Sequence, residues 1–208
     1  MSTWAIVVAA GAGRRFGGPK HEALLAGEPL WRRAVSAVEA AGVDGVVVVG
    51  PVPGGVPGGA RRRDSVASGL AHVPEGATVV VVHDAARPLA SPRLVEAVVR
   101  RVGLGDVDGV VPAVPVRDTL KVVTDGRVVR TVDRSRLVAV QTPQAFAADV
   151  LRAAHEVVGP DEDVTDDAGL VEAMGGTVVT IPGEVTNLKV TFPDDLRLAA
   201  AILETEDR

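Results

Sequence analysis

The sequence predicts an α/β fold in which a Rossmann-like, mostly parallel (mixed) sheet carries helices on both faces and a β-hairpin arm protrudes. Valine-rich runs of strand length, such as 46–49 and 79–82, alternate with segments whose apolar residues recur every three or four positions. Apolar residues make up 47% of the chain and aromatic residues only 2%, so valine and alanine must fill the core. Such runs favour strands that are buried on both faces of a sheet.

The predicted strands and helices alternate along the chain. Strands are expected at 4–8, 46–49, 79–82, 109–114, 138–140, 177–181 and 188–190. Helices are expected at 29–41, from Asp64 or Ser65 to Leu70, at 91–102, at 147–158, from Thr165 to about residue 174, and at 193–203. Ser91-Pro92 and Pro193 are typical helix starts. This order of elements favours a mostly parallel sheet.

The helical periodicity disappears between residues 117 and 136. Asp125-Gly126 separates two short apolar segments, 120–123 and 128–132, which is the pattern of a β-hairpin. Because an isolated hairpin is only marginally stable in water, we expect this arm to pack against a partner subunit. No repeat or linker divides the 208 residues, so we expect one domain, 1–208, with 117–136 as an arm for dimerisation.

Composition excludes several classes of function. A net charge of −5 argues against a surface that binds nucleic acid, so phosphate chemistry would need a local cluster of cations. The chain has no cysteine, which excludes disulfides and thiolate metal sites. No apolar run approaches the roughly 20 residues of a membrane span. We therefore expect a soluble, cytoplasmic protein with no nucleic-acid or membrane partner.

A glycine-rich loop, residues 9–20, follows the first predicted strand. It combines glycines, which let backbone N–H groups approach phosphate oxygens, with the cations Arg14, Arg15 and Lys20. The loop is no Walker A motif because it has no Gly-Lys pair, and Phe16 occupies the third glycine position of a Rossmann fingerprint. We predict that it cradles a nucleoside triphosphate. The alternative is an ordinary strand-to-helix turn with solvated charges.

Two further segments carry charge at places where open sheets bind ligands. Asp84 follows the predicted strand 79–82, which makes it a candidate Mg²⁺ ligand. The run 61–63 consists of three arginines beside a helix start and forms either an anion site or a solvated face. His83 is expected to fix its own loop, because no second histidine lies at ligand spacing. Cations around a triphosphate with one carboxylate for a metal are typical of nucleotidyl transfer.

Nine segments together resemble the 2-C-methyl-D-erythritol 4-phosphate cytidylyltransferases of the non-mevalonate isoprenoid pathway. The resemblance covers nearly the whole chain, with motifs in order at 9–15, 19–20, 64–66, 83–88, 115–119, 131–134, 141–144, 165–168 and 187–191. It implies that CMP passes from CTP to 2-C-methyl-D-erythritol 4-phosphate, releasing pyrophosphate, with Mg²⁺ as cofactor. It also implies a homodimer whose arm completes the acceptor site of the partner.

The resemblance also implies roles for individual residues. The groups on the α-phosphate would be Arg15, Lys20 and Lys189, and the metal ligand would be Asp84. The nucleotide site would consist of Ala9, Ala10, Gly11, Ala12, Gly13, Gly59, Ser65 and Ala85. The site for the acceptor phosphate would consist of Arg87, Thr119, Arg134, Thr142 and Thr165, with Thr119 and Arg134 acting in trans. The pattern of residues alone does not single out Lys189, and Arg14 receives no role.

Alternatives remain at this point. A ribitol- or ribulose-5-phosphate cytidylyltransferase would share the fold and the CTP site, and a non-catalytic nucleotide-binding module would keep the glycines. Thr165 is equally a helix cap, and Asp166 and Asp167 could serve only the helix dipole. The chain departs from the family in its short loop 50–59 and in Ala60, where relatives commonly have an acidic or polar residue.

Overall fold

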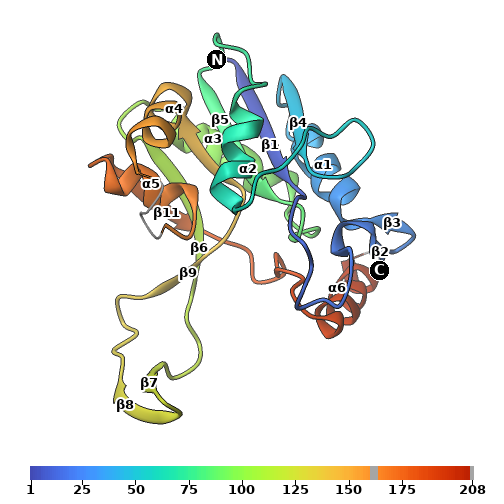
Figure 1. Cartoon of the computed structure of the whole chain (residues 1–208), viewed down its shortest axis with the longest axis vertical. Coiled ribbons are helices and arrows are strands. Elements are labelled where there is room, and N and C mark those ends of the chain that lie inside the picture. Colours follow the sequence, from blue (N-terminus) through green and yellow to red (C-terminus); the bar gives the residue numbers. More distant parts are fainter. Residues whose placement is uncertain (160–163, 207–208) are drawn as a thin grey trace.

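A mixed, seven-stranded sheet forms the centre of the computed structural model, which describes residues 1–159 and 164–206 (Figure 1). Six strands follow the order β11-β6-β10-β5-β1-β4, and β9 pairs with β6. The strands β4, β1, β5, β6 and β11 run in one direction, and β9 and β10 run against them. The strands comprise β1 (Thr3–Val8), β4 (Gly45–Val49), β5 (Val79–Asp84), β6 (Gly109–Pro115), β9 (Val138–Val140), β10 (Gln144–Ala147) and β11 (Val178–Pro182). This confirms the predicted mostly parallel sheet.

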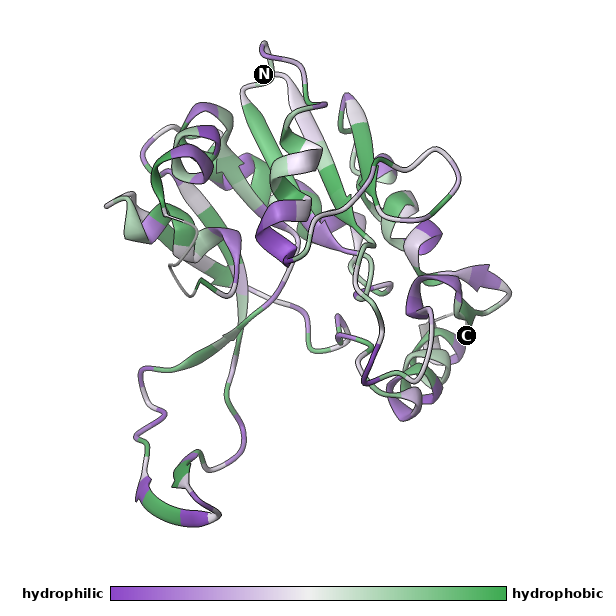
Figure 2. Ribbon diagram, in the orientation of Figure 1, coloured by the Kyte–Doolittle hydropathy of each residue, from purple (hydrophilic) through white to green (hydrophobic). Residues whose placement is uncertain are grey.

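Helices cover both faces of the sheet, as predicted. One face packs against α1 (Leu30–Ala40) and α3 (Pro92–Val102), and the other against α2 (Arg62–Leu70), α4 (Ala148–Val157) and α5 (Asp167–Ala173). Successive residues of β1 alternate between the two cores: Ile6 belongs to one, and Ala5 and Val7 belong to the other. The strands form an apolar band between the helices in Figure 2.

A smaller apolar cluster lies beside the main body, between the start of α1 and the C-terminal helix α6 (Pro193–Glu206). It includes Leu25, Leu30, Val190 and Ala199. A two-residue hairpin, β2 (Leu24–Leu25) with β3 (Glu28–Pro29), and the 3₁₀ turn η1 (Lys20–Glu22) contribute to this region. The sequence pattern predicted neither the short β2–β3 hairpin nor β10. Among the described residues, no helix has the length and apolar character needed to cross a membrane.

The predicted arm is a β-hairpin that extends well away from the body (Figure 1). It pairs β7 (Lys121–Thr124) with β8 (Arg127–Thr131), and the turn places Asp125 and Gly126 at φ values of 49° and 75°. Two left-handed central residues are typical of a type I′ hairpin turn, which confirms the role predicted for Asp-Gly. Val128 and Val129 on the arm are more than 60% exposed.

Three local predictions were wrong. Helix α2 starts earlier than expected: its N-cap is Arg61, and Asp64 is the third helical residue, accepting a 3.0 Å hydrogen bond from the Arg61 backbone N–H. Asp166, not Thr165, caps α5, because its carboxylate accepts from the Gly169 N–H at 3.1 Å. Residues 188–190 form no strand, and Val190 instead donates one backbone hydrogen bond to the carbonyl of Ala86. The other predicted strands and helices are present with small shifts at their ends.

Candidate active site

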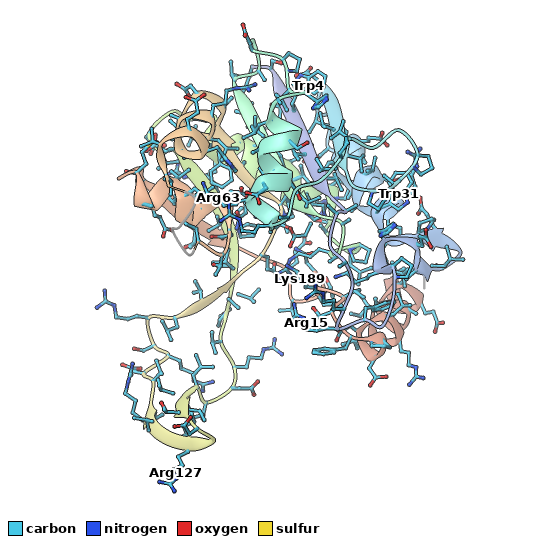
Figure 3. All side chains as sticks on the ribbon, viewed as in Figure 1. Trp4, Arg15, Trp31, Arg63, Arg127 and Lys189 are labelled. Carbon is cyan, nitrogen blue, oxygen red and sulfur yellow. The ribbon has the colours of Figure 1, made fainter. Side chains whose placement is uncertain are left out.

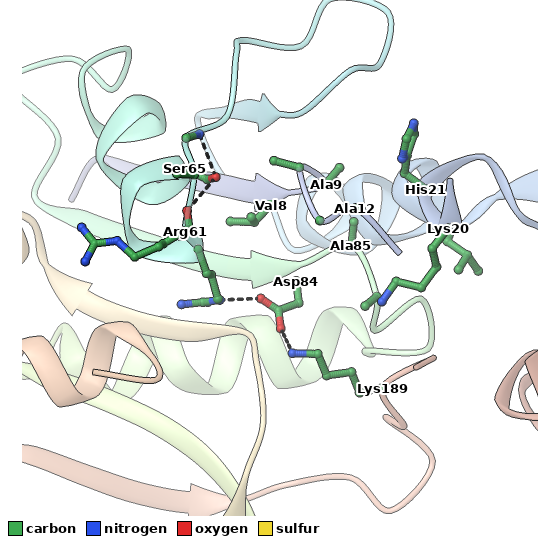
Figure 4. Close-up of a pocket in the computed structure, with 17 residues that line it drawn as sticks. Val8, Ala9, Ala12, Lys20, His21, Arg61, Ser65, Asp84, Ala85 and Lys189 are labelled. Atoms are coloured by element: carbon green, nitrogen blue, oxygen red, sulfur yellow. Dashed lines mark hydrogen bonds and ion pairs between the residues drawn. The ribbon is translucent and has the colours of Figure 1, made fainter. Parts of the chain in front are cut away.

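A cavity of about 400 Å³ lies beyond the carboxyl ends of β1 and β5 (Figure 4). The glycine-rich loop forms one wall, the first turn of α2 forms another, and residues just after β5 form the floor. Its volume suits a small organic ligand. Open α/β sheets bind ligands at this edge, because side chains and loop N–H groups at the carboxyl ends of the strands are not used by the sheet and remain available to a ligand.

Most residues predicted for the nucleotide and its chemistry line this one cavity. They are Ala9, Ala10, Gly11, Ala12, Lys20, Gly59, Ser65, Asp84, Ala85 and Lys189. Val8, His21, Leu30 and Ala86 also line it, without having been predicted to do so. Arg61 and Arg62, from the run considered as an anion site, line it as well, as does Ala60. The structure therefore brings together segments that are as far apart in the chain as residues 9 and 189.

Two predicted residues of the glycine-rich loop do not line the cavity. Gly13 has a φ of 61°, and an added Cβ would lie 2.0 Å from the carbonyl oxygen of Gly18, so this glycine lets the loop fold back on itself. Arg15 is exposed. Its charge is nevertheless one of those that lower the pKa of Lys20, after burial and Lys189, and Figure 3 shows it in the same region as Lys189.

Ser65 shapes the wall that α2 contributes. Its hydroxyl accepts from the Gly59 N–H and donates to the carbonyl of Arg61, both at 3.1 Å. An added Cβ at Gly58 would lie 2.3 Å from the Ala10 Cβ, so the two walls approach closely at this point. The serine thus fixes the 58–61 turn against the glycine-rich loop, which keeps the wall of the cavity in place.

Asp84 lies at the centre of the charged residues in the cavity, between two cations (Figure 4). Its Oδ1 accepts from Arg62 Nε at 3.0 Å, and its Oδ2 accepts from Lys189 Nζ at 2.6 Å. Burial alone would raise the pKa of the Asp84 carboxyl, but the charges of Arg62 and Lys189 outweigh burial and hold the pKa well below its ordinary value. Asp84 is therefore a fixed carboxylate that stays ionised.

Arg62 connects Asp84 to a second buried carboxylate. Its Nη1 donates to Asp167 Oδ2 at 2.6 Å, and His155 Nε2 lies 3.3 Å from the other oxygen of Asp167. Burial would lower the pKa of Arg62, yet the charges of Asp167 and Asp84 outweigh it and raise the pKa. Asp167 therefore does more than favour a helix dipole, because it is the buried counter-charge of Arg62.

The three consecutive arginines have three different partners. The anion-site hypothesis fits only part of the run, because Arg61 and Arg62 line the cavity and Arg63 does not. Arg61, the N-cap of α2, forms an ion pair at 2.8 Å with Asp64 in the first turn of that helix. Arg63 donates to the carbonyls of Val158 and Gly159 at the end of α4, both at 2.8 Å. Only Arg62 faces the charged centre of the site.

Lys20 is a cation without a carboxylate partner among the described residues. Its Nζ donates to the carbonyl of Val190 at 2.9 Å. Burial, followed by the charge of Lys189, lowers the pKa of the Lys20 amine. Two neighbouring cations in one cavity repel each other, so an anion placed between Lys20 and Lys189 would be attracted by both.

A second, smaller cavity of about 220 Å³ adjoins the first, because Arg62, Asp84 and Lys189 line both. Three of the residues predicted for the acceptor, Arg87, Thr142 and Thr165, line this second cavity. Val140, Gln141, Gln144 and Asp166 line it as well and were not predicted. The two cavities therefore meet at one carboxylate and two cations.

A chain of hydrogen bonds fixes the residues between the two cavities. The Asp84 N–H donates to Thr142 Oγ1 at 3.0 Å, and the threonine hydroxyl in turn lies 3.1 Å from His83 Nδ1. His83 Nε2 faces the Arg87 carbonyl at 3.2 Å, so these partners assign the proton to Nε2. Burial lowers the pKa of His83 to about 4. The neutral imidazole holds its own loop, as predicted.

Hydrogen bonds to two backbone carbonyls hold the Arg87 side chain in place. Its Nη1 donates to the Asn187 carbonyl at 2.7 Å, and its Nη2 donates to the Val140 carbonyl at 3.3 Å. Burial lowers its pKa. These contacts orient the guanidinium. The bond to Asn187 also fixes the segment that carries Lys189.

The two remaining predicted residues, Thr119 and Arg134, belong to the arm and line neither cavity. Arg134 Nη1 donates to the Val116 carbonyl at 3.1 Å at the base of the arm, and both residues are exposed. The structure therefore does not bring them to the site within a single chain.

The residues of the cavity fit a magnesium ion that arrives with phosphates. No group of three or more His, Cys, Asp or Glu side chains among the described residues could hold a metal by itself. Among the described residues, Asp84 is the one carboxylate that lines the larger cavity, and it is buried. Mg²⁺ is commonly held by one or two carboxylates together with substrate phosphates, so a single aspartate is sufficient.

Comparisons with known proteins give one consistent result. The family model for 2-C-methyl-D-erythritol 4-phosphate cytidylyltransferase (IspD) matches residues 3–205. The chain is 48% identical over 216 residues to the protein of that name from Frankia casuarinae, covering 96% of this chain and 80% of the relative. The crystal structure of such a protein from Thermus thermophilus superposes with a TM-score of 0.83 at 33% identity, covering 96% of this chain and 98% of the other.

Some relatives are longer. The chain is 44% identical over 230 residues to a bifunctional enzyme IspD/IspF from Nitratidesulfovibrio vulgaris. The match covers 97% of this chain and 58% of that relative, so the chain spans a little over half of the bifunctional protein.

Proposed function

Because the chain belongs to the 2-C-methyl-D-erythritol 4-phosphate cytidylyltransferase (IspD) family, we propose that it transfers CMP from CTP to 2-C-methyl-D-erythritol 4-phosphate. The products are 4-diphosphocytidyl-2-C-methyl-D-erythritol and pyrophosphate. The single observation that carries the proposal is that two cavities share Arg62, Asp84 and Lys189. A donor in the larger cavity and an acceptor in the smaller one would meet at this charged boundary.

In the proposed reaction, an oxygen of the acceptor phosphate attacks the α-phosphorus of CTP. The new P–O bond forms as the bond to the β-phosphate oxygen breaks, and pyrophosphate leaves with that electron pair. The attacking phosphate is already anionic near neutral pH, so the reaction requires no general base. Negative charge accumulates around the α-phosphate in the transition state, and we assign its stabilisation to Lys20 and Lys189, which line the same cavity.

Positioning accounts for the remaining contributions. Holding two phosphates in line removes much of the entropic cost of bringing them together. We assign the glycine-rich loop and the turn that Ser65 fixes to the nucleotide. Arg87 and Thr142 are assigned to the acceptor, because both are held by hydrogen bonds at the wall of the smaller cavity.

Magnesium is part of the proposal, with Asp84 as its protein ligand. When bound, the ion would neutralise phosphate charge and make pyrophosphate a better leaving group. Arg15 is exposed in the structure, and we propose that it joins the triphosphate only when the nucleotide is bound.

We also propose that the arm completes the acceptor site of a second copy, with Thr119 and Arg134 acting in trans. Residues 117–136 carry six cations and three carboxylates, although the whole chain has a net charge of −5. None of these charges forms an ion pair between described residues. A basic arm on an acidic chain is complementary to the body of another copy.

Subunit complementation tests the dimer. Mixing Arg134→Ala with Lys20→Ala chains would pair an intact arm with an intact body in one of the two sites of each mixed dimer. Random exchange should then restore about a quarter of wild-type turnover, as expected for a two-fold symmetric pair. If the mixture shows only the sum of the two separate activities, the arm does not act in trans.

The reaction itself is tested by pyrophosphate release from a panel of nucleoside triphosphates crossed with sugar-alcohol phosphates. We expect CTP with 2-C-methyl-D-erythritol 4-phosphate to exceed CTP with ribitol 5-phosphate by at least about 10²-fold in kcat/KM, roughly 2.7 kcal/mol in transition-state stabilisation. Comparable rates for the two acceptors would favour the ribitol-phosphate alternative.

A further inference from the structure

Arg62 joins three separate elements through one guanidinium. It extends from the first turn of α2 to Asp84 at the end of β5 and to Asp167 at the start of α5. Its Nε bonds Asp84 Oδ1 at 3.0 Å, and its Nη1 bonds Asp167 Oδ2 at 2.6 Å. The planar fork of a guanidinium can hold two carboxylates at fixed angles, which a lysine amine cannot do.

The Asp167 end of this contact is the anchored end. The side chain of Asp167 is 0% exposed, and His155 contacts its second oxygen. Removing one partner of a buried ion pair leaves an uncompensated charge, which is strongly unfavourable. Arg62 is therefore held in place by a contact that lies outside both cavities.

Lys189 contacts the other oxygen of Asp84. Unlike Arg62, it is not anchored by a second, buried carboxylate among the described residues. Its side chain is 43% exposed, compared with 24% for Arg62, and Asp84 is its only ion-pair partner among the described residues. It belongs to a segment without regular secondary structure. Of the two cations on Asp84, Lys189 is the one that can leave at the lower cost.

Arg62 also keeps an unused donor. Its Nη2 is buried and has no hydrogen-bond partner among the described residues. Since Arg62 lines both cavities, that donor is available to an oxygen of a molecule bound at their boundary.

We propose that Arg62, anchored by Asp167, is a positioning residue that fixes the Asp84 carboxylate, so that Lys189 rather than Arg62 changes partner when metal and nucleotide bind. Asp84 Oδ2 then becomes free for the metal, and the Lys189 amine moves from the carboxylate to the phosphates. This inference rests on the proposed function, since it assumes that Asp84 is the metal ligand.

Direct metal binding tests the inference without turnover. Mn²⁺ can replace Mg²⁺ as the probe, and its free concentration can be followed by electron paramagnetic resonance with CTP present and the acceptor omitted. We compare Arg62→Lys and Asp167→Asn with Arg63→Lys, the same substitution one residue further along the helix. Among the described residues, the Arg63 guanidinium hydrogen-bonds only to carbonyls at the end of α4, so Arg63 is a matched control.

We expect Arg62→Lys to weaken Mn²⁺ binding by about 10- to 100-fold, the usual effect of losing a residue that orients a metal ligand. Asp167→Asn should weaken it in the same direction, although this side chain lines neither cavity. Arg63→Lys should match wild type in its affinity for Mn²⁺. CTP affinity measured by calorimetry without metal should fall by a smaller factor than Mn²⁺ affinity in Arg62→Lys and Asp167→Asn. Lys189→Met should bind Mn²⁺ without nucleotide more tightly than wild type, because a competing cation is removed.

The direction of these changes in Mn²⁺ affinity shows whether Arg62 acts by orienting the Asp84 carboxylate or only through its charge. Arg62→Lys keeps the charge, so a loss of metal affinity reports the lost geometry. The inference is overturned if Arg62→Lys and Asp167→Asn bind Mn²⁺ as tightly as Arg63→Lys, even if their melting temperatures fall. It is also overturned if Lys189→Met weakens binding as much as Arg62→Lys does. If wild type binds CTP and Mn²⁺ but transfers CMP to no acceptor, the proposed function fails while this test still decides the role of Arg62.

Discussion

Charged side chains at the centre of the body are paired with one another within the chain, whereas those of the arm are not paired with any described residue. In the body, Arg62, Asp84, Asp167 and Lys189 form a continuous set of ion pairs within one chain. On the arm, residues 117–136, six cations have no carboxylate partner among the described residues, and Arg127 projects from the tip in Figure 3. A single chain therefore preforms the body site, whereas the arm has the features of a surface that acts on another molecule.

The largest effect should come from Lys20, a cation that lines the cavity and has no carboxylate partner among the described residues. Replacing Lys20 with Ala removes a charge that we assign to the developing negative charge on the α-phosphate. We expect kcat for CMP transfer to fall by about 10²- to 10³-fold, the usual effect of losing one stabilising donor. Pyrophosphate release at saturating substrates measures it.

Arg14→Ala is the matched control for Lys20→Ala. Arg14 belongs to the same loop and is exposed, and it makes no hydrogen bond or ion pair among the described residues. We expect wild-type turnover from it. If Lys20→Ala also keeps wild-type turnover, Lys20 is not part of the catalytic set.

The sequence predicted those elements of the fold whose spacing records burial. Strand β1 and helix α1 each bury a regular set of apolar residues, and the hairpin turn has a specific Asp-Gly signature. Strand β10 escaped prediction because it has only four residues and continues directly into a helix. The start of α2 was misplaced because an arginine serves as its N-cap, which residue preferences disfavour.

Residues that line the cavity could be selected from the sequence where a local pattern marks them. Asp84 could be found because it ends a buried strand, and Lys20 because it ends a glycine-rich loop. Lys189 came only from the family resemblance. Arg62 could not be distinguished from its two arginine neighbours, because its anchor, Asp167, is 105 residues away in the chain and only the tertiary structure brings the two together.

A second prediction concerns the buried network beside the charged centre, and it makes stability depend on pH. His83 has an ordinary pKa of 6.5 and a pKa of about 4 in the folded protein, because burial disfavours the imidazolium. Between these values the unfolded chain takes up a proton that the folded chain does not. His83 therefore favours the folded state fully above pH 6.5, and this contribution is lost as the pH falls towards 4. The loss amounts to about 3 kcal/mol.

Urea unfolding of wild type and His83→Gln between pH 7 and pH 4 measures this contribution. The variant can be less stable at every pH, so only the difference in slope is informative. We expect the free energy of unfolding of wild type to fall more steeply with decreasing pH than that of the variant. Parallel curves would mean that the imidazole can be protonated inside the folded protein.

The smallest effect should come from the tip of the arm, and it tests the other half of the comparison. The Arg127 side chain makes no hydrogen bond or ion pair among the described residues, so Arg127→Ala should change the free energy of unfolding by less than about 0.5 kcal/mol at low protein concentration. Arg152→Ala is the matched control. Arg152 donates to the carbonyls of Leu70, Val73 and Pro74 in the body, and its loss should cost about 1–3 kcal/mol.

Raising the protein concentration turns the same measurement into a test of what the arm binds. A contact between two copies stabilises the folded state by mass action, so wild type should gain stability with concentration. If Arg127 contributes to that contact, Arg127→Ala should gain less, and the small difference should widen as concentration rises. A loss above about 1 kcal/mol that does not depend on concentration would mean that the arm folds against its own body. The contrast between a charged centre that one chain preforms and an arm that acts on a second copy would then be wrong.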